Sequence, residues 1–481
     1  MKSTSKSGKD YRVESDLIGS RDIPQSVYYG VQTLRGVENF EISKFHLRDY
    51  PDFIKGLAIT KWGAAVANHE LGLITDEQYK AIVAACQDLI DGKFADQFPV
   101  DMIQGGAGTS TNMNANEVIA NIALEHMGHK RGEYEYCSPH DVVNHSQSTN
   151  DAYPTAIHIG MYFSHLRFVE NLKILIESLR RKSVEFMNVI KIGRTQLEDA
   201  VPMTLGQEFS GYASILEEEL PHLENAAEDF LTVNMGATAI GTGITAEPGY
   251  AVLCVSALAD ITGWQIKLAP DLVGATSDTS CLVGYASALK RVAVKMNKIC
   301  NDLRLLASGP RCGLGEINLP AMQPGSSIMP GKVNPVIPEV MNQICYKVIG
   351  NELCVTMAGD AAQMELNAME PIMALCDFES VEIMINGFET LRMRCIEGIT
   401  ANVQKCHDDM LKSISIVTAL NPVIGYSNST KLAKEALETG KSVYDLVLDH
   451  DILSKEDLDT ILAPENMIQP VRLNIKPKKY I

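Results

Sequence analysis

The most regular hydrophobic pattern in the chain lies between residues 282 and 306. Large apolar side chains follow one another there in alternating steps of three and four, which is the spacing of one α-helical face. They are Leu282, Tyr285, Leu289, Val292, Met296, Ile299, Leu303 and Leu306. A helix of this length extends ~37 Å, and its narrow apolar seam needs several helical neighbours. The pattern therefore predicts the core of a large helical bundle, and not a cofactor-binding stripe.

Apolar residues at helical spacing continue on both sides of this segment, and strand-like alternation is scarce. The further helical patterns cover residues 53–71, 76–90, 116–127, 154 to about 191, 205–233, 336–357 and 370–399. The segment 205–233 contains an interior Pro221, where we expect a kink. Short helices with a turn at Asn421-Pro422 are expected to follow. Together these patterns predict a mainly α architecture.

Composition limits which cellular compartment and which binding partners are expected for the chain. The chain has 481 residues, 46% of them hydrophobic, and a formal net charge of −18, which argues against nucleic acid and anionic membranes as partners. Eleven cysteines without a CxxC pair suggest reduced thiols in a cytoplasmic protein. No zinc-binding motif occurs, so we expect no metal. Residues 1–10 have no apolar core and are typical of a disordered tail, not a signal peptide.

One loop, residues 325–335, concentrates polar chemistry between two helical patterns. It holds Ser326, Ser327, Lys332 and Asn334 within nine residues. A phosphate-binding P-loop does not fit, because five residues rather than four separate the two glycines and Val333 replaces the Mg²⁺-binding hydroxyl. Considered alone, the loop is more typical of a solvated turn than of a binding site. Its backbone N–H groups and side chains could instead bind a small anion.

Three more polar segments stand at predicted helix ends. Each could be an ordinary helix cap or a solvated loop, and each could also supply donors to an anion. They are Gly105–Ser110 with Thr109, Asn144–Asp151 with Ser148, Thr149 and Asn150, and Arg194–Asp199 with Thr195 and Gln196. No Ser-His-Asp arrangement and no cofactor motif accompanies them, so no cofactor is expected. Such a set of hydroxyls, amides and one ammonium can bind carboxylates and stabilise additional negative charge.

The amino-acid sequences of these segments resemble the motifs of the L-aspartase/fumarase superfamily. The likeness extends from Tyr28–Thr33 to Leu420–Pro422, and it is densest for the bacterial aspartate ammonia-lyases, or aspartases. One departure lies at residues 138–141, where Ser-Pro-His-Asp replaces the His-Pro-Asn-Asp usual in fumarases. We therefore carry over no second anion site.

The resemblance implies a mainly α, three-domain fold with a central long-helix bundle. Its parts would be an N-terminal mixed, mostly helical domain (1–147), the central bundle (148–402) and a small C-terminal helical domain (403–481). It also implies a homotetramer whose active sites are shared between subunits, and a small dicarboxylate substrate.

The implied reaction is the reversible β-elimination of ammonia from L-aspartate, giving fumarate through an aci-carboxylate. Ser326 would be the general base, activated as an alkoxide by Lys332 and loop N–H groups. The resemblance assigns Thr109, Ser148, Thr149 and Ser327 to the β-carboxylate, Thr195, Lys332 and Asn334 to the α-carboxylate, and Asn150 and Gln196 to the amine. Glu339 matches the superfamily position that pairs with residue 196.

Position 196 separates the two closest interpretations. Fumarases place His there, because expelling hydroxide from malate needs a general acid. An ammonium group already carries its proton, and a Gln cannot titrate, so Gln196 suits an ammonia-lyase better. Some aspartases carry His, so the alternative of a class II fumarate hydratase stays open. A non-catalytic helical scaffold is disfavoured because every expected polar position is present.

Overall fold

The computed structural model describes residues 10–480, apart from the side chain of Pro464, and within them the chain is mainly α-helical. The expected tail lies outside the described residues except for Asp10. No helix in the described part of the chain is both long enough and apolar enough to cross a membrane. The chain forms two compact units, and the long helices α5 (Thr149–Glu185), α10 (Ser280–Leu306), α11 (Val336–Asp360) and α12 (Glu370–Arg394) contribute residues to both.

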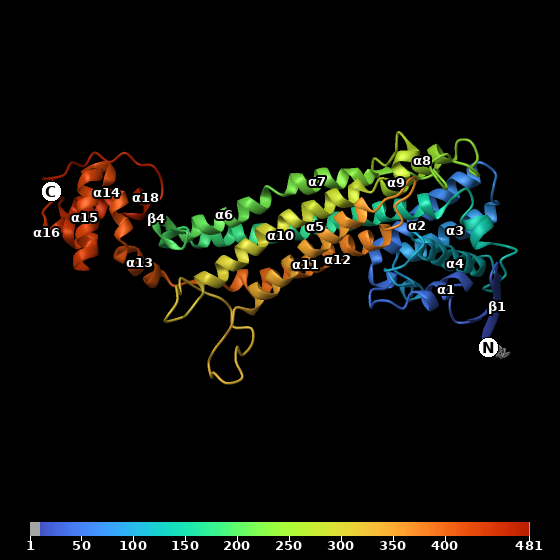
Figure 1. Ribbon diagram of the computed structural model, residues 1–481, viewed down its shortest axis with the longest axis horizontal. Coiled ribbons are helices and arrows are strands. Elements are labelled where there is room, and N and C mark those ends of the chain that lie inside the picture. The colour runs from blue at the N-terminus through green and yellow to red at the C-terminus, as the bar shows by residue number, and fades with distance from the viewer. Residues whose placement is uncertain (1–9, 481) are drawn as a thin grey trace. The chain divides into compact units, whose positions relative to one another are not determined.

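The helix α10 confirms the strongest sequence pattern. All eight seam residues from Leu282 to Leu306 are buried, none more than 5% exposed. The two residues that precede the predicted segment, Ser280 and Cys281, also belong to the helix. Figure 1 shows α10 as one of the long helices of the fold.

Unit 1 comprises Met1–Glu170, Glu219–Ala293 and Tyr346–Ile385. Its remaining elements are β1 (Tyr11–Asp16), β2 (Gly19–Pro24), α1 (Val31–Asn39), α2 (Pro51–Glu70), α3 (Asp76–Ile90), α4 (Thr109–His126), α7 (Leu220–Glu228), β5 (Thr232–Val233), α8 (Tyr250–Thr262), β6 (Lys267–Leu268) and α9 (Leu272–Ser277). β1 pairs antiparallel with β2, with Tyr11 opposite Pro24, and β5 pairs parallel with β6. Helices α2, α3 and α4 lie side by side (Figure 1).

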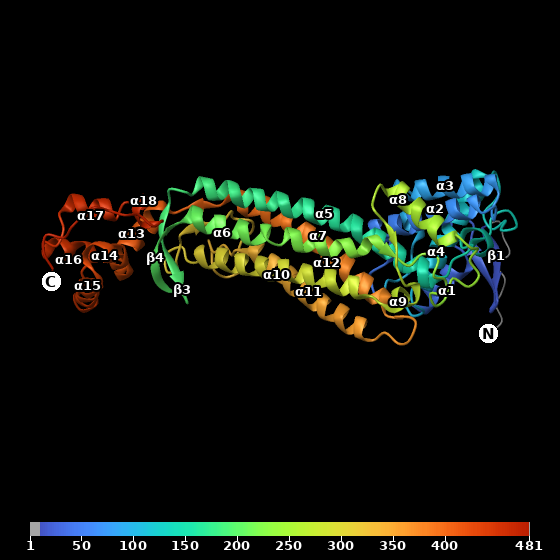
Figure 2. The same cartoon turned by 90° about the horizontal axis from the view of Figure 1, so that it is seen from above.

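Unit 2 comprises Asn171–Glu218, Val294–Cys345 and Asn386–Ile481. Its remaining elements are β3 (Ile190–Thr195), β4 (Glu198–Thr204), α6 (Leu205–Glu217), β7 (Ile317–Asn318), β8 (Thr400–Ala401), α13 (Val403–Lys412), α14 (Val417–Ile424), α15 (Tyr426–Thr439), α16 (Val443–Asp449), α17 (Lys455–Ile461) and α18 (Pro464–Met467). β3 and β4 form an antiparallel hairpin, seen in Figure 2. β7 pairs antiparallel with β8.

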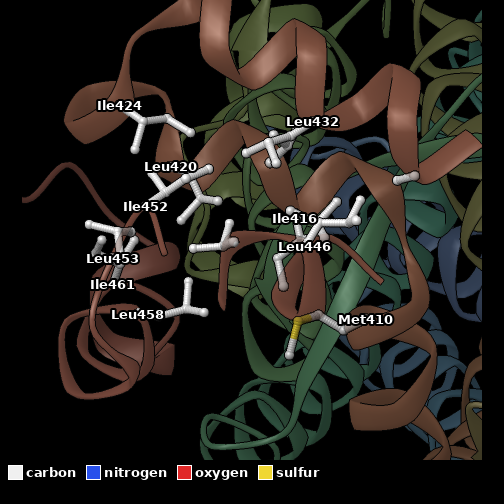
Figure 3. Close-up of a cluster of buried hydrophobic side chains, with 14 of the residues drawn as sticks. Met410, Ile416, Leu420, Ile424, Leu432, Leu446, Ile452, Leu453, Leu458 and Ile461 are labelled. Carbon is white, nitrogen blue, oxygen red and sulfur yellow. The ribbon is translucent and has the colours of Figure 1, made fainter. Parts of the chain in front are cut away.

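The short C-terminal helices enclose an apolar core of their own. Leu420 and Ile424 of α14 meet Leu432 of α15 and Leu446 of α16, and each is at most 1% exposed (Figure 3). The helices are too short to be stable alone, so this shared burial holds them together. The division of the chain at residues 148 and 403 into three domains stays a prediction.

Several predicted details were wrong. Residues 190–204, expected as the end of a helix and a charged loop, form the β3–β4 hairpin, in which Ile190 and Ile192 are buried. The expected turn at Asn421-Pro422 lies inside α14, which ends instead at Ile424, with Gly425 at φ 80° as its C-cap. Pro154 lies within α5 and not in its first turn, since the helix begins at Thr149. The break near Pro221 is confirmed, because α6 ends at Glu217 and α7 begins at Leu220.

Candidate active site

The starts of α4 and α5 meet in unit 1 and bring four of the predicted residues into one region. Gly108, the N-cap of α4, has φ 88°, and a β-carbon there would lie 2.5 Å from the Tyr153 ring of α5. Only glycine combines this backbone with so close a contact. The contact places Thr109, the first residue of α4, near Ser148, Thr149 and Asn150 at the start of α5.

An amide cluster beneath this region connects the two helix starts. The Asn112 amide of α4 donates to the Thr149 hydroxyl at 3.3 Å and to the side-chain oxygen Oδ1 of Asn144 at 3.1 Å. The buried Lys61 ammonium of α2 donates to Asn112 at 2.7 Å and to Gln147 at 2.8 Å. Burial lowers the pKa of Lys61 to about 7. Sequence reasoning missed this contact, because Lys61 stands in an otherwise apolar helical pattern.

Asp151 fixes the start of α5 to the loop that follows β5. Its fully buried carboxylate accepts hydrogen bonds from the backbone N–H groups of Ser148, Gly236 and Thr238 at 2.9–3.0 Å. Burial raises its pKa to about 6, against the lowering effect of these donors. The Asn150 amide donates to the carbonyl oxygen of Ala239 at 2.7 Å, so part of its hydrogen-bonding capacity serves the same loop.

In unit 2, the predicted residues Thr195 and Gln196 stand at the tip of the β3–β4 hairpin. The two-residue turn consists of Gln196 at φ 57° and Leu197 at φ 67°. Hairpin turns of this kind favour Asn and Gly, because left-handed backbone strains other side chains. Thr195, Gln196 and Leu197 are all solvent-exposed. The tip therefore presents two polar side chains on a strained backbone that no burial stabilises.

The loop of residues 325–335 is closed by hydrogen bonds between its two ends, which form its neck. The predicted residues lie on the loop between these ends. The Gly325 N–H donates to the carbonyl oxygen of Lys332 at 2.7 Å, and the Asn334 amide donates to the carbonyl oxygen of Gly325 at 2.8 Å. A β-carbon at Gly325 would lie 2.7 Å from the backbone nitrogen of Asn334, so the neck requires glycine. Ser327 and Lys332 belong to this same loop, and Lys332 is exposed on it.

The Ser326 hydroxyl faces the backbone of its own loop. Its oxygen accepts hydrogen bonds from the N–H groups of Ile328 at 3.2 Å and Met329 at 3.0 Å. Such a contact also occurs in ordinary serine turns. It is chemically significant because hydrogen bonds to an ionised oxygen are about twice as strong as neutral ones, so both donors favour an alkoxide over the neutral hydroxyl.

Glu339 lies in the first turn of α11, one turn after the loop, as the sequence predicted. Among the described residues, no hydrogen bond joins it to Gln196 within the chain. The predicted residues thus form three groups: Thr109 with Ser148–Asn150 in unit 1, and the hairpin tip and the 325–335 loop in unit 2. The described residues contain no group of three or more His, Cys, Asp and Glu side chains placed to hold a metal ion.

Comparison with known proteins identifies the class. The family described as Lyase matches residues 19–350, and the fumarase C C-terminal family matches residues 416–469. The chain therefore belongs to the lyase family that includes the fumarases and aspartases, which confirms the resemblance seen in its motifs.

Individual proteins within this family are similar to the chain over nearly its whole length. The chain is 55% identical to the aspartate ammonia-lyase of Pseudomonas aeruginosa over 95% of its own length and 97% of the relative's. It is 53% identical to the aspartate ammonia-lyase of Escherichia coli over 98% of both chains. Among solved structures, a fumarate lyase from Brucella melitensis shares 50% identity, with a TM-score of 0.92 over 96% of this chain and all of that one. A class II fumarase from Schistosoma mansoni shares 34% identity, with a TM-score of 0.89 over 95% and 99% of the two chains. These neighbours confirm the mainly α fold.

Proposed function

We propose that this protein converts L-aspartate reversibly to fumarate and ammonia. The observation that carries the proposal is the identity of 53–55% with aspartate ammonia-lyases over nearly the full length. Gln196, which cannot act as a general acid, supports the same choice between the two branches of the family. The reaction as proposed uses only groups of the chain itself.

The proton on the carbon beside the β-carboxylate is removed by Ser326. A serine hydroxyl is a weak base, so its alkoxide must be stabilised before it can act. The N–H groups of Ile328 and Met329 supply two donors to this oxygen, and the Lys332 ammonium on the same loop adds a positive charge. Together these groups would favour the charged form of the hydroxyl.

Loss of this proton produces an aci-carboxylate, whose extra negative charge must be bound. Thr109, Ser148, Thr149 and Ser327 would donate to its two oxygens, which lowers the barrier because these donors are already oriented when the charge develops. The Thr109 hydroxyl donates to the Gly106 carbonyl oxygen at 2.8 Å, so it must turn toward the substrate on binding. Thr195, Lys332 and Asn334 would bind the α-carboxylate.

The amine leaves near Asn150 and Gln196. An ammonium group carries the proton that ammonia needs, so departure requires no acid from the protein. Amide side chains can hold the amine through their carbonyl oxygens. Glu339 completes this end of the site as the partner of residue 196.

The proposal includes the assembly and location of the enzyme. We infer a cytoplasmic homotetramer in which the hairpin tip, the 325–335 loop and the start of α5 come from different subunits. The absence of a Gln196–Glu339 hydrogen bond within the described part of one chain is consistent with partners in separate subunits. The predicted three-domain division belongs to the same inference.

The decisive experiment follows the ultraviolet absorbance of fumarate with aspartate and then with malate as substrate. We expect fumarate to form from aspartate and essentially none from malate, because general acid catalysis is worth about 10²–10⁴-fold in such a step. Equal rates with both substrates would contradict the role of Gln196 and favour the fumarase alternative. Gln196→His is expected to retain part of the aspartate activity.

Two loop variants separate the base from the anion anchor. Ser326→Ala is expected to lose most turnover while aspartate still binds. Lys332→Ala is expected to weaken binding by about 2–5 kcal/mol, since it leaves a carboxylate without its cation. The measurements are kcat from steady-state kinetics and Kd from equilibrium titration. Near-normal turnover in Ser326→Ala would rule out the assigned base.

Subunit sharing is tested by mixing two inactive variants, Ser326→Ala and Thr195→Ala. Refolded together, they form mixed tetramers in which some active sites carry neither substitution. Partial recovery of activity is expected in these mixtures. If mass spectrometry verifies mixed tetramers and no activity returns, the three groups do not meet between subunits.

A further inference from the structure

A buried carboxylate lies behind the strained hairpin tip in unit 2. Glu316 is 0% exposed and stands just before β7. One of its oxygens accepts a hydrogen bond from Arg194 of β3 at 2.5 Å, and its other oxygen forms an ion pair with Lys191 of β3 at 2.7 Å. The second contact lacks hydrogen-bond alignment. Two cations on one strand therefore converge on a single carboxylate.

The backbone around Glu316 is itself fixed. Its N–H donates to the carbonyl oxygen of Leu306 at 2.9 Å, and its own carbonyl oxygen accepts from the Asn402 N–H at 2.8 Å. The Cys406 thiol also approaches this oxygen, at 3.6 Å. The Glu316 backbone is thus attached to the end of α10 and to the start of α13, which anchors the residue outside the hairpin.

Arg194 connects the fixed Glu316 carboxylate to the strand that enters the turn. It directly precedes Thr195, and a β-bulge between Ile192 and Arg194 shifts the pairing at this end of the hairpin. The two left-handed residues beyond, Gln196 and Leu197, are exposed. A strained turn persists only where its surroundings determine it, and the pairs that Glu316 forms with Lys191 and Arg194 hold the strand that leads into this turn.

We propose that Glu316 is a positioning residue for Thr195 and Gln196. This inference rests on the proposed function, because it concerns how those two side chains are presented to the substrate. The carboxylate itself does not contact substrate. It holds β3 at the one register in which Thr195 and Gln196 project from the tip, and a displacement of about 1 Å in such groups can cost 10²-fold in activity.

A matched control exists within the same ion-pair cluster. Glu208 of α6 also pairs with Lys191, at 2.7 Å, and its side chain is 20% exposed. No hydrogen bond or ion pair joins it to Arg194 among the described residues. Glu208→Gln therefore removes a negative charge beside Lys191 and leaves the Arg194–Glu316 contact in place, whereas Glu316→Gln weakens that contact with almost no change in side-chain volume.

The test compares Glu316→Gln, Arg194→Gln and Glu208→Gln as full-length enzymes. We expect KM for aspartate to rise by about 10–10²-fold in the first two, with little change in kcat, because Thr195 is proposed to bind a carboxylate whose charge is constant through the reaction. Glu208→Gln should match the wild type. Hydrogen exchange of residues 190–204 should accelerate in the first two variants only.

Each other outcome decides the matter. An unchanged KM in Glu316→Gln, or a lower kcat alone, would mean that the carboxylate only stabilises the fold, and the inference fails. If Glu316→Gln does not fold, the KM of Arg194→Gln decides between these outcomes by the same criterion. If wild-type enzyme is inactive toward aspartate, the proposed function fails, and equal hydrogen exchange in all three variants would separately overturn the anchoring role.

Discussion

Glu370 gives the fold a pH dependence that one substitution should remove. This first residue of α12 is 3% exposed and lines a cavity of about 260 Å³ together with His158 and Cys281. Its carboxyl has no hydrogen-bond or ion-pair partner among the described residues. Burial raises its pKa from 4.5 to about 8. The folded protein therefore holds a proton at neutral pH that the unfolded chain has released.

The sign and size of the effect follow from proton linkage. Where the folded state binds more protons than the unfolded state, the free energy of unfolding falls as pH rises. For Glu370 this loss extends from about pH 4.5 to about pH 8, at about 1.4 kcal/mol per pH unit. Between about pH 5.5 and pH 8 the integrated loss is about 3 kcal/mol.

Glu370→Gln replaces the protonated carboxyl with a neutral amide of nearly the same shape. We expect the stability advantage of the variant over the wild type to grow by about 3 kcal/mol between about pH 5.5 and pH 8. Denaturant unfolding of both proteins at several pH values measures the difference, and the exposed Glu365→Gln serves as control. Parallel stability curves for wild type and Glu370→Gln would refute the reasoning.

Three further predictions concern stability, measured by denaturant unfolding. Because burial lowers the Lys61 pKa to about 7, the folded state releases that proton first, and wild-type stability relative to Lys61→Met should rise from about pH 7 to pH 10. Gly56→Ala should destabilise the protein by about 1–3 kcal/mol or more, since its β-carbon would lie 2.1 Å from a backbone oxygen of α5. Its control, Gly211→Ala in α6, has open space around the new methyl group and should stabilise the protein by about 0.5–1 kcal/mol. Leu420→Ala should cost about 2–5 kcal/mol, whereas the exposed Leu437→Ala should change stability by no more than about 0.5 kcal/mol.

The long helices could be predicted because their signal is local and repeated. Eight apolar residues at steps of three and four leave one helical face to bury, and α10 buries all of them. Helix ends were less certain. Pro422 signals a turn by propensity, yet α14 continues through it because Leu420 and Ile424 on either side belong to one buried cluster. Packing between distant segments outweighs propensity there.

The β3–β4 hairpin was missed for a related reason. Short hairpins are recognised by Asn-Gly or Asp-Gly between alternating apolar residues, and here Gln196-Leu197 occupies the turn. Nothing in the local sequence favours left-handed backbone at either residue. The information lies instead in Lys191 and Arg194, whose charges have meaning only when Glu316, more than a hundred residues later, is placed beside them.

The chemistry of Ser326 shows the same division between residue type and geometry. The sequence places a serine between glycine and lysine in a loop, which suffices to suggest a base and its cation. It does not show that the N–H groups of Ile328 and Met329 both point at the serine oxygen. These donors are backbone groups, so the two hydrogen bonds do not involve the side chains at 328 and 329, both of which are exposed. The basicity of Ser326 therefore depends on the path of the loop, which the Gly325 neck maintains, and not on the neighbouring side chains.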